Sequence, residues 1–345
     1  MRFALICIAL LIGNDWAGNA SAGNASDGYA ERPEVQAYIS ELVETYQFEE
    51  AALLEVFRSA RRQNGILEAI ARPAERTKSW AEYREIFVNK RRIDAGTRFW
   101  GENEAALKRA EQRYNVAPEV IVAIIGVETR YGRVTGGYRV VDALATLAFD
   151  YPPRAAFFRS ELTHLLLLAR DDKLDPLALT GSYAGAMGYG QFMPSSYREY
   201  AIDFDGDGVR DIWTNTTDAI GSVANYFSRH GWRGDGPVAV RVEVHGDAAK
   251  AVANQGLKLA HGVGALRALG VEAGPISDDA MAALFEMEGD SGVEYWLGLH
   301  DFYVITRYNH SQMYALAVWQ LGEAIRLVRA DQNLADSQNF VTPGG

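Results

Sequence analysis

The chain has 345 residues, 48% hydrophobic and 23% charged, which suits about two domains of a globular protein with a sizeable core. Its formal net charge of −11 argues against a nucleic-acid partner, because phosphate binding needs a basic surface. The same charge disfavours adsorption to an anionic membrane.

The first 22 residues have the pattern of a secretory signal peptide. Arg2 gives a short basic region, the apolar stretch Phe3 to Ile12 is too short to span a bilayer, and Ala20-Ser21-Ala22 offers a cleavage site. The one cysteine, Cys7, lies inside this stretch, so a cleaved chain has no disulfide and no cysteine-ligated metal. We expect a periplasmic protein that is exported and soluble, with no membrane anchor after cleavage. The alternative is that the segment stays in place as an N-terminal anchor.

Helical patterns follow. The segments "PEVQAYISELVETY", "EEAALLEVFRSA" and "GENEAALKRAEQRY" carry apolar residues at helical spacing. In the next helix, "VIVAIIGVETRYG", Pro118 suits the first turn and Gly132 suits the end. "RAAFFRSELTHLLLLARDD" and "AIGSVANYFSRHGW" continue the helical signal.

The pattern changes to strand after Pro237. Valines alternate with other residues in "PVAVRVEVH", and "AALFEME" and "VEYWLGL" are the predicted partners of that strand. "SQMYALAVWQLGEAIRLVRA" is apolar on most sides and therefore predicts a buried helix. The predicted organisation is a signal peptide 1–22, a linker 23–32, an N-terminal helical domain 33–113, a core 114–233 with a loop 203–214, a small α/β subdomain 234–301, a core helix 302–330 and a polar tail 331–345.

Glu128 ends an aliphatic helix, which is an unusual place for a carboxylate. Poor solvation and the negative end of the helix dipole both raise the pKa of such a group. A carboxylic acid that stays protonated near neutral pH can protonate a leaving oxygen. The alternative is a surface glutamate that pairs with Arg130 or Arg133, which would lower its pKa.

The segment "GSYAGAMGYGQFMPSSYREY" is rich in small residues, which let a ligand approach the backbone. Gln191 adds an amide, and Tyr183, Tyr189 and Phe192 add flat apolar faces, a combination that suits sugars. A tight glycine turn between two core helices is the alternative. "ITRYNHSQMYALAVWQ" again places an amide among tyrosines, and Asn309 or Ser311 can cap the helix that follows.

The segment "DFDGDGVRDIW" matches a calcium loop of the D-x-D-x-D-G type, with Gly208 at the sixth position. The predicted oxygen ligands are the side chains of Asp203, Asp205, Asp207 and Asp211 and the backbone carbonyl of Val209. Thr214 stands where the pattern has a bidentate glutamate, and Asp218 can supply that carboxylate. We expect a structural Ca²⁺; an aspartate-rich turn without metal is the alternative. No phosphate loop, dinucleotide fingerprint or histidine cluster appears, so no organic cofactor is expected.

Together these segments resemble the B-type lytic murein transglycosylases. "GVETRYG", "GAMGYGQFMPSSY", "DFDGDGVRDIW", "DAIGSVANYF" and "ITRYNHSQMYALAV" carry the resemblance in the family's order, over roughly 33–329. The resemblance implies a mainly α protein with a lysozyme-like helical core, an N-terminal helical domain and a small α/β subdomain. It also implies cleavage of the β-1,4 bond between N-acetylmuramic acid and N-acetylglucosamine in peptidoglycan strands without water, which leaves 1,6-anhydro ends.

The resemblance assigns roles to residues. Glu128 would be the single catalytic acid and then base, with the muramoyl N-acetyl group assisting at the anomeric carbon. The glycan groove would be lined by Ser182, Gln191, Phe192, Tyr226, Tyr308, Asn309 and Tyr314, with Tyr83 and Arg154 as further members. The cation site would use Asp203, Asp205, Asp207, Val209 and Asp218. Tyr131 stands where a tryptophan is common in the family, and one extra residue precedes Asp218.

Two other functions remain open on the sequence. A hydrolytic muramidase would need a second carboxylate across the groove, for which Asp142, Asp150 and Glu199 are the candidates. A non-catalytic peptidoglycan-binding scaffold would keep the groove and lose the reaction. Protein partners are not indicated by any pattern.

Overall fold

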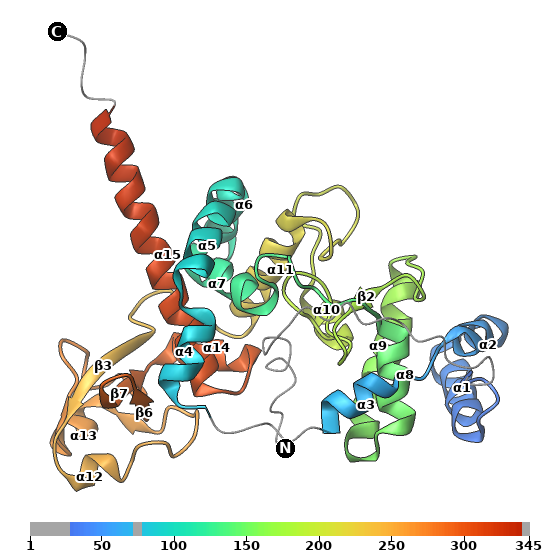
Figure 1. The fold of residues 1–345 in the computed structure, drawn as a ribbon, viewed down its shortest axis with the longest axis horizontal. Helices are drawn as coiled ribbons and strands as arrows, with labels where there is room; N and C mark the ends of the chain where they lie inside the picture. Colours follow the sequence, from blue (N-terminus) through green and yellow to red (C-terminus); the bar gives the residue numbers. More distant parts are fainter. Residues whose placement is uncertain (1–27, 72–77, 340–345) are drawn as a thin grey trace. The chain divides into compact units, whose positions relative to one another are not determined.

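The structure is a computed structural model that describes residues 28–71 and 78–339. The side chains of residues 333–339 fall outside that description, as does the predicted signal peptide. The described chain is mainly helical, as expected (Figure 1), with one five-stranded sheet and one short two-stranded sheet. None of its helices is both long enough and apolar enough to cross a membrane.

The chain divides into two compact units, and each is formed by two separate stretches of sequence. Unit 1 contains the described residues of Arg76–Tyr131 and Ile220–Gly345. Unit 2 contains those of Ile8–Glu75 and Gly132–Ala219. The domain boundaries expected from the sequence do not coincide with the limits of these two units, and they stay a prediction.

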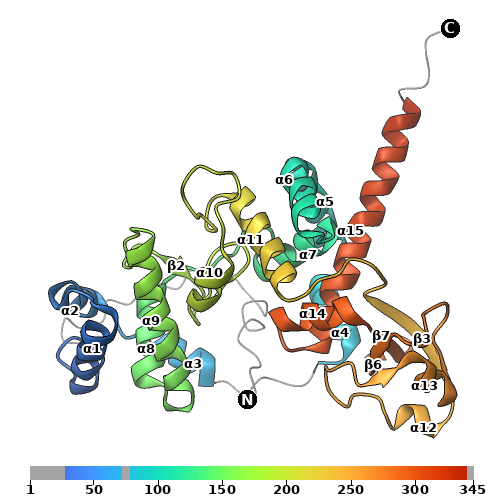
Figure 2. The same cartoon turned by 180° about the vertical axis from the view of Figure 1, so that it is seen from behind.

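Unit 2 is a helical unit in which α8 packs against α9, while α3 contacts α8 and α10 contacts α9 (Figure 2). Its elements are α1 (Pro33–Tyr46), α2 (Glu50–Ser59), α3 (Asn64–Ala71), β1 (Tyr138–Arg139), α8 (Val140–Asp150), α9 (Ala155–Asp171), β2 (Thr180–Gly181) and α10 (Pro194–Tyr200), with a short 3-10 turn at Pro152–Arg154. The helices expected in "PEVQAYISELVETY" and "RAAFFRSELTHLLLLARDD" are thereby confirmed.

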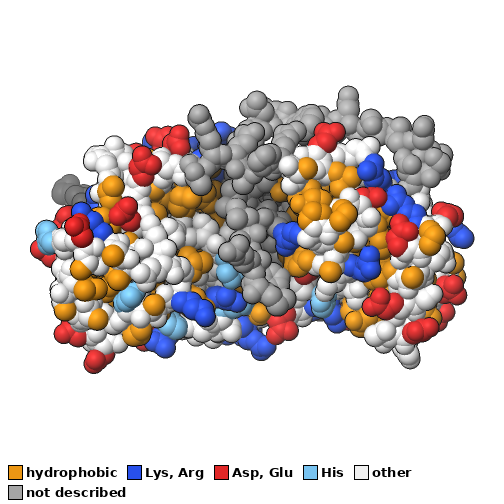
Figure 3. All heavy atoms as spheres, turned by 90° about the horizontal axis from the view of Figure 1, so that it is seen from below, with side chains coloured by type: hydrophobic (Ala, Val, Ile, Leu, Met, Phe, Trp, Pro, Cys, Tyr) orange, Lys and Arg blue, Asp and Glu red, His pale blue; other side chains and the backbone are white. Residues whose placement is uncertain are grey.

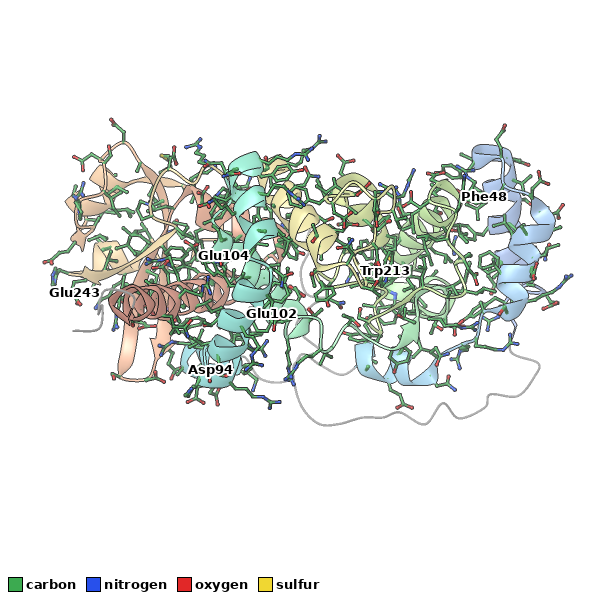
Figure 4. The ribbon with its side chains drawn as sticks, turned by 90° about the horizontal axis from the view of Figure 1, so that it is seen from above. Phe48, Asp94, Glu102, Glu104, Trp213 and Glu243 are labelled. Carbon is green, nitrogen blue, oxygen red and sulfur yellow. The ribbon has the colours of Figure 1, made fainter. Side chains whose placement is uncertain are left out.

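Unit 1 is organised around α15, which contacts α4, α5, α7 and α14. The helices are α4 (Trp80–Phe87), α5 (Lys90–Glu102), α6 (Glu104–Tyr114), α7 (Pro118–Thr129), most of α11 (Thr216–Arg229), α14 (His300–Tyr308) and α15 (Gln312–Asn339). The first part of α15 is buried, as its apolar sequence predicts, while Leu327 further along is 56% exposed. Near this exposed part, Arg329 of α15 pairs at 3.3 Å with Glu104, which is labelled in Figure 4.

A five-stranded antiparallel sheet in unit 1 has the strand order β4-β6-β7-β3-β5. The strands are β3 (Ala239–Val244), β4 (His261–Gly262), β5 (Val271–Glu272), β6 (Met281–Gly289) and β7 (Gly292–Gly298), with the short helices α12 (Asp247–Lys250) and α13 (Val263–Ala268). Leu284, Leu297 and Leu266 belong to one buried cluster that joins the sheet to α13. All three predicted strands are confirmed. The exposed and buried residues of β3 alternate, whereas Ala282 to Phe285 of β6 are all buried, so both faces of that strand are covered.

Helix α7 is the most completely buried helix of unit 1, since every residue from Val120 to Thr129 is buried. Pro118 occupies its first turn as expected. Its end differs from the expectation: the capping residue is Arg130, with a left-handed φ of 53°, and Gly132 follows two residues later with a φ of 82°. The chain therefore turns away from α7 over several left-handed residues instead of one glycine.

On the surface seen in Figure 3, hydrophobic side chains occur in groups between charged ones. Such a mixture is usual, because polar groups cannot cover the whole surface of a protein. A function therefore has to be argued from specific sites.

Candidate active site and cation loop

Glu128 is held in an apolar environment near the end of α7, with 4% of its surface exposed. Its neighbours along the helix are aliphatic side chains that offer no hydrogen bonds, so a carboxylate there is poorly solvated. Burial raises the pKa of Glu128 to about 8, and a hydrogen bond from Tyr314 opposes that rise. The group is therefore mainly a neutral acid at pH 7, as the sequence predicts.

Tyr314 reaches Glu128 because α7 and α15 run antiparallel. The Tyr314 hydroxyl donates to Oε1 of Glu128 over 2.6 Å, between the end of α7 and the start of α15. Further along α15, Gly322 approaches Glu119 of α7 so closely that a Cβ atom would lie 2.9 Å from the Glu119 carbonyl oxygen. A residue larger than glycine at 322 would push the two helices apart and disturb the bond to the acid.

The two arginines that follow α7 do not neutralise the acid. Within the described part of the chain, neither Arg130 nor Arg133 forms an ion pair with Glu128, and both are exposed. The alternative of a surface glutamate in an ion pair is therefore wrong. Local sequence could not decide this, because the left-handed turn at Arg130 directs the chain away from the buried face.

A buried arginine that the sequence does not reveal supports the end of α7. Arg92 is 7% exposed and donates to the carbonyl oxygens of Gly126 and Ile86. Burial lowers its pKa to about 10. A cation beside the last carbonyl groups of a helix is favourable. Arg92 precedes Gly126 by 34 residues, so no local motif points to this contact.

Tyr131 packs inside unit 1. Its hydroxyl donates to the carbonyl oxygen of Arg92 over 2.9 Å, and its ring lies 5.6 Å from that of Phe99. A Cβ atom on Gly126 would lie 2.5 Å from the Tyr131 hydroxyl oxygen, so glycine leaves the space for this ring. The ring of Tyr131, at the position where the resemblance implies an aromatic residue, thus packs on α5 and connects it to the end of α7.

A group of aromatic side chains joins α11 to α14. Tyr226 stacks on His230 at 4.0 Å and meets Tyr308 edge-on at 4.7 Å. Its hydroxyl donates to the Arg307 carbonyl oxygen over 2.7 Å. Burial is the main cause that lowers the pKa of His230, so this imidazole is neutral at pH 7. The two predicted groove residues Tyr226 and Tyr308 are therefore in contact.

Asn309 follows Tyr308 and is 6% exposed. Both polar atoms of its side chain are buried, and neither has a partner among the described residues. A buried amide without partners is unfavourable unless a ligand or water satisfies it. Of the two caps considered for α15, Ser311 is confirmed, because its Oγ accepts from the Tyr314 backbone N–H over 3.3 Å. Asn309 is thus left available for another role.

Tyr83 lies on α4 and is 3% exposed. Its ring is 6.4 Å from that of Trp80 and 5.0 Å from that of Phe87. Helix α4 begins with a capping box formed by Ser79 and Glu82. The box sets the first residue of the helix and therefore the positions of these aromatic residues along it.

In unit 2 the glycine-rich segment forms a tight, buried turn. The Ser182 hydroxyl oxygen accepts from the Ala186 N–H over 3.0 Å, and the Ser182 N–H donates to the Ala186 carbonyl over 2.8 Å. Met187 and Phe192 exchange two backbone hydrogen bonds of 2.8 and 2.9 Å. The backbone of this segment therefore forms the tight turn of the structural alternative. A structural turn does not account for the side chain of Gln191.

Gln191 sits in this turn with a left-handed φ of 51°, which is unfavourable for a residue with a Cβ atom. Its Nε2 donates to the carbonyl oxygens of Thr135 and Gly188 at 3.1 and 3.0 Å. Its Oε1 is buried and has no donor within the described residues. The side chain therefore presents an acceptor held in a fixed position.

Arg154 closes the short turn before α9. Its guanidinium lies 4.4 Å from the ring centre of Phe157 and 5.2 Å from that of Phe158. Burial lowers the pKa of Arg154, but from so high a value that the group stays charged. It is a half-buried cation supported by aromatic faces.

The aspartate loop brings carboxylates together. Ligand atoms of Asp203, Asp205 and Asp218 lie within 4.8 Å of one another. The predicted use of Asp218 in place of the last loop residue is consistent with this geometry. Burial raises the pKa of Asp218, and the nearby Asp205 carboxylate adds to the effect. Three acidic groups so close repel one another unless a cation lies between them, so the donor set fits a hard cation such as Ca²⁺.

The other predicted ligands are arranged differently. The Asp207 carboxylate accepts from the Val209 N–H over 2.8 Å and is not in the cluster that the structure describes. Asp211 accepts from the backbone N–H groups of Trp213 and Thr214 at 2.8 and 2.9 Å, so it shapes the loop exit. Trp213, labelled in Figure 4, donates to the Thr180 carbonyl over 3.1 Å.

Asn215, which was not predicted as a member of this loop, also contacts one of its carboxylates. Its Nδ2 donates to Asp205 over 2.8 Å, and its Oδ1 accepts from the Thr217 N–H over 2.9 Å. The second contact is the only available signal, since asparagine is a favoured residue at a helix start.

Two of the three candidate second carboxylates, Asp142 and Asp150, have structural partners in unit 2. Asp142 forms an ion pair of 2.9 Å with Arg139 and accepts from the Arg61 N–H over 2.9 Å. Asp150 accepts from the Tyr29 hydroxyl over 2.6 Å and pairs with Arg32 at 2.9 Å. Carboxylates held in this way fasten the N-terminal segment to α8. Neither has the isolated, apolar environment that distinguishes Glu128.

The site residues are thus divided between the two units. Unit 1 holds Glu128 with its partner Tyr314, the contacting pair Tyr226 and Tyr308, and Asn309 and Tyr83. Unit 2 holds Ser182, Gln191, Phe192, Arg154 and the aspartate loop. A single groove formed by both sets stays a prediction from the resemblance.

Comparisons with known proteins agree with this chemistry. The family model described as "Transglycosylase SLT domain" matches residues 30–323. Membrane-bound lytic murein transglycosylase B of Escherichia coli (strain K12) is 46% identical over 312 residues, which cover 87% of this chain and 85% of that protein.

Two solved proteins have a similar fold. The soluble lytic transglycosylase SltB1 from Pseudomonas aeruginosa is 52% identical, with a TM-score of 0.84 over 86% of this chain and 100% of that one. The lytic transglycosylase Slt35 of Escherichia coli was solved in complex with calcium and in complex with bulgecin A. It is 46% identical, with a TM-score of 0.81 over 88% of this chain and 95% of that one.

Proposed function

The chain belongs to the transglycosylase SLT domain family and is a lytic murein transglycosylase with a mainly α, lysozyme-like fold, and we propose that Glu128 is the single acid and base of its reaction. The observation that carries the proposal is the burial of this carboxyl, which raises its pKa to about 8. At pH 7 such a group is protonated in about ten molecules for each one that is ionised.

In the first step the Glu128 carboxyl gives its proton to the oxygen that links N-acetylmuramic acid to N-acetylglucosamine. The bond between this oxygen and the anomeric carbon breaks, and the muramoyl N-acetyl oxygen stabilises the positive charge that develops at that carbon. The sugar's own acetamido group takes the position of the second carboxylate that most glycosidases use. This agrees with the structural partners of Asp142 and Asp150.

In the second step the ionised Glu128 takes the proton of the muramoyl 6-hydroxyl, whose oxygen then bonds to the anomeric carbon. The 1,6-anhydro ring closes, the carboxyl regains its proton and no water is consumed. A carboxylate with a raised pKa is a stronger base than an ordinary glutamate, so burial assists this step as well. The Tyr314 hydroxyl donates to the anion between the two steps and prevents it from becoming too unstable to form.

We further propose that the glycan strand is bound by amides and aromatic faces in both units. The residues are Tyr83, Arg154, Ser182, Gln191, Phe192, Tyr226, Tyr308, Asn309 and Tyr314. Support comes from Asn309 and the Oε1 atom of Gln191, which are buried without partners among the described residues. Sugar hydroxyl and acetamido groups can satisfy such atoms, and the tyrosine rings suit the CH faces of sugars. The complex of Slt35 with bulgecin A supports the presence of a ligand-binding site in a similar protein.

We propose that the loop of Asp203, Asp205, Asp207, Val209 and Asp218 binds a structural Ca²⁺. The close carboxylates of Asp203, Asp205 and Asp218 support this, as does the calcium complex of Slt35. The ion would neutralise the loop and hold it against the start of α11, and it takes no part in the steps above.

We also propose that the protein is exported to the periplasm, with residues 1–22 as its signal peptide. Support comes from the sequence pattern and from the location of peptidoglycan, which is outside the cytoplasm. The domain organisation stated from the sequence, including the small α/β subdomain 234–301, is likewise proposed from the sequence pattern.

The experiment that tests the function is mass spectrometry of the fragments released from purified sacculi. Lytic cleavage gives 1,6-anhydro ends, whereas a hydrolytic muramidase gives reducing ends that are heavier by one water. Fragments with only reducing ends would contradict the reaction, and an absence of fragments would favour a binding scaffold.

A further inference from the structure

Unit 1 has a pocket that none of the assigned residues lines. Its volume is about 480 Å³, and it lies between α4, the hairpin of β6 and β7, and α15. Three tryptophans, Trp80, Trp296 and Trp319, line it from these three elements. Figure 1 shows α4 beside α15 with the sheet next to it, and α4 contacts both α15 and β6. Its volume lies within the range of small-ligand sites.

The pocket faces away from the acid. An α-helix turns by about 100° per residue, so Trp319 lies about 140° and Glu323 about 180° around α15 from Tyr314. Tyr314 is buried and bonded to Glu128, whereas the pocket residues of α15 belong to its partly exposed side. A ligand in this pocket therefore does not compete for the position of the sugar at Glu128.

The register of the sheet collects the pocket's side chains on one face. Trp296 on β7 lies opposite Arg241 on β3, and Glu294 stands two residues before Trp296 on the same face. Arg241 and Glu294 form an ion pair of 3.4 Å. Val293 and Leu327, which are 59% and 56% exposed, also line the pocket. The pocket thus joins flat indole surfaces to a polar edge.

The charged side chains that line the pocket disfavour an anionic ligand. Arg84 and Arg241 are the cations of the lining, and Asp290, Glu294 and Glu323 outnumber them. Arg84 is bonded to Asp290 at 3.2 Å and to the Gln320 oxygen at 2.8 Å. No cation of the lining is therefore left to attract a phosphate or a carboxylate. Ion pairs at a pocket edge still offer donors and acceptors to neutral hydroxyl groups.

We propose that this pocket binds a neutral N-acetylated hexosamine unit of a glycan strand, separate from the unit that is cleaved. The indole faces would pack on the CH face of the sugar, and the side chains of Arg84, Gln320 and Glu294 would bond its hydroxyls. The Nε1 atoms of Trp80 and Trp296 are buried without acceptors among the described residues, and oxygen atoms of a bound sugar would provide the acceptors that these donors lack. The proposal rests on the family activity, because that activity keeps glycan strands close to the protein.

A second contact with the same polymer raises the effective concentration of the strand at the acid without changing the chemical step. It would keep the enzyme on an insoluble sacculus between cleavages. The expected consequence is slower release from sacculi than from short soluble fragments.

The test is calorimetric titration of the full chain carrying Glu128→Gln with chitotriose, a neutral N-acetylglucosamine trimer. Adding Trp319→Ala is expected to remove one bound equivalent, or to weaken it by about tenfold or more. Trp319→Phe keeps a flat ring and is expected to retain the equivalent. Trp100→Ala, on α5 and outside the pocket lining, is the matched control and is expected to change nothing. The thermal melt of each variant checks that it is folded, and Trp296→Ala replaces Trp319→Ala if the latter is not.

Nuclear magnetic resonance identifies the site. The indole N–H signals of Trp296 and Trp319 are expected to move with chitotriose in a saturable way. Unchanged stoichiometry together with unchanged affinity in folded Trp319→Ala would overturn the proposal, and so would shifts caused by a stem pentapeptide but not by chitotriose. Continued release of anhydro ends by Glu128→Gln would refute the assignment of Glu128 as the acid. The proposal for the pocket would still be decided by the number of chitotriose equivalents bound.

Discussion

The hydroxyl of Tyr314 donates to Oε1 of Glu128 across 2.6 Å, although the two residues are 186 positions apart in the chain. The bond lowers the pKa of the acid while burial raises it, and burial is the larger effect because the pKa is about 8. Glu128 thus remains protonated at neutral pH. Once it has ionised, its carboxylate still accepts a hydrogen bond from the Tyr314 hydroxyl.

Glu128→Gln is expected to reduce the release of anhydro fragments from sacculi by about a thousandfold or more, because an amide can neither give nor take the proton. Binding of glycan should remain measurable. Glu119→Gln is the matched control, since Glu119 lies on the same helix with a pKa also raised by burial. Turnover by Glu128→Gln at the rate of the control would refute the assignment.

Tyr314→Phe removes the bond that stabilises the ionised form of Glu128, so the pKa of the acid should rise further. Activity falls when this acid ionises, and the alkaline limb of the kcat/KM profile should move upward by about one pH unit. Tyr131→Phe, whose hydroxyl bonds the Arg92 carbonyl instead, should leave the limb in place. A limb that does not move in Tyr314→Phe would show that another group titrates there.

The raised pKa of Glu128 also predicts how stability depends on pH. The folded chain holds the proton up to pH 8, whereas the unfolded chain loses it near the ordinary value of 4.5. Stability from this group is therefore full below about 4.5 and is lost as the pH rises through about 8. The Tm of Glu128→Gln minus the Tm of the unchanged chain should therefore increase as the pH is raised from 5 to 9. A constant difference in Tm over that interval would contradict the burial of an ionisable group.

Calcium should stabilise the chain through the carboxylates of Asp203, Asp205 and Asp218. At a free concentration of about 100 times Kd, the gain is about 2.7 kcal/mol, which calorimetry detects as a rise in Tm of several degrees. A chelator should reverse the rise, and Asp218→Asn should remove it. Asp94→Asn, which affects only a surface pair with Lys90, should keep it. Identical melting curves with calcium and with chelator would exclude the site.

Gly188 and Gly231 both have left-handed φ values, 68° and 86°, but differ in the space around them. A Cβ atom at Gly188 would lie 2.4 Å from the Ile212 carbonyl oxygen, whereas nothing lies within 4 Å of one at Gly231. Gly231→Ala should cost about 1 kcal/mol of unfolding free energy for the backbone conformation alone. Gly188→Ala should cost about 3 kcal/mol or more, as measured by denaturant unfolding. Equal losses would mean that the turn can move away from Ile212.

Local periodicity was enough to predict the elements with the strongest patterns. The alternation around Val240 and Val242 predicted β3, and the apolar run before Glu128 predicted a helix, which the structure shows to be buried almost throughout. Both patterns are strong because one whole face, or every face, is excluded from water. The end of α7 was not predictable in the same way, since Arg130 adopts the left-handed conformation that glycine favours.

The candidate site was predictable only where its residues lie close in the sequence. The aspartate loop was recognised from its spacing, but the contribution of Asn215 was not. The hydrogen bond between Tyr314 and Glu128 was not predicted, because helix packing brings the two residues together; the resemblance implied only a groove role for Tyr314. Arg92, which supports the carbonyl end of α7, illustrates the same limit. Side chains brought together by tertiary packing leave no periodic signal.

The antiparallel pairing of α7 with α15 has a consequence for the order of events during synthesis. The helix that carries Glu128 is complete after 129 residues, but the tyrosine that bonds it belongs to a helix that begins at Gln312. An unfinished chain therefore lacks the contact that completes the acid's surroundings. The surroundings that set the pKa of Glu128 are therefore complete only after nearly the whole polypeptide has been synthesised.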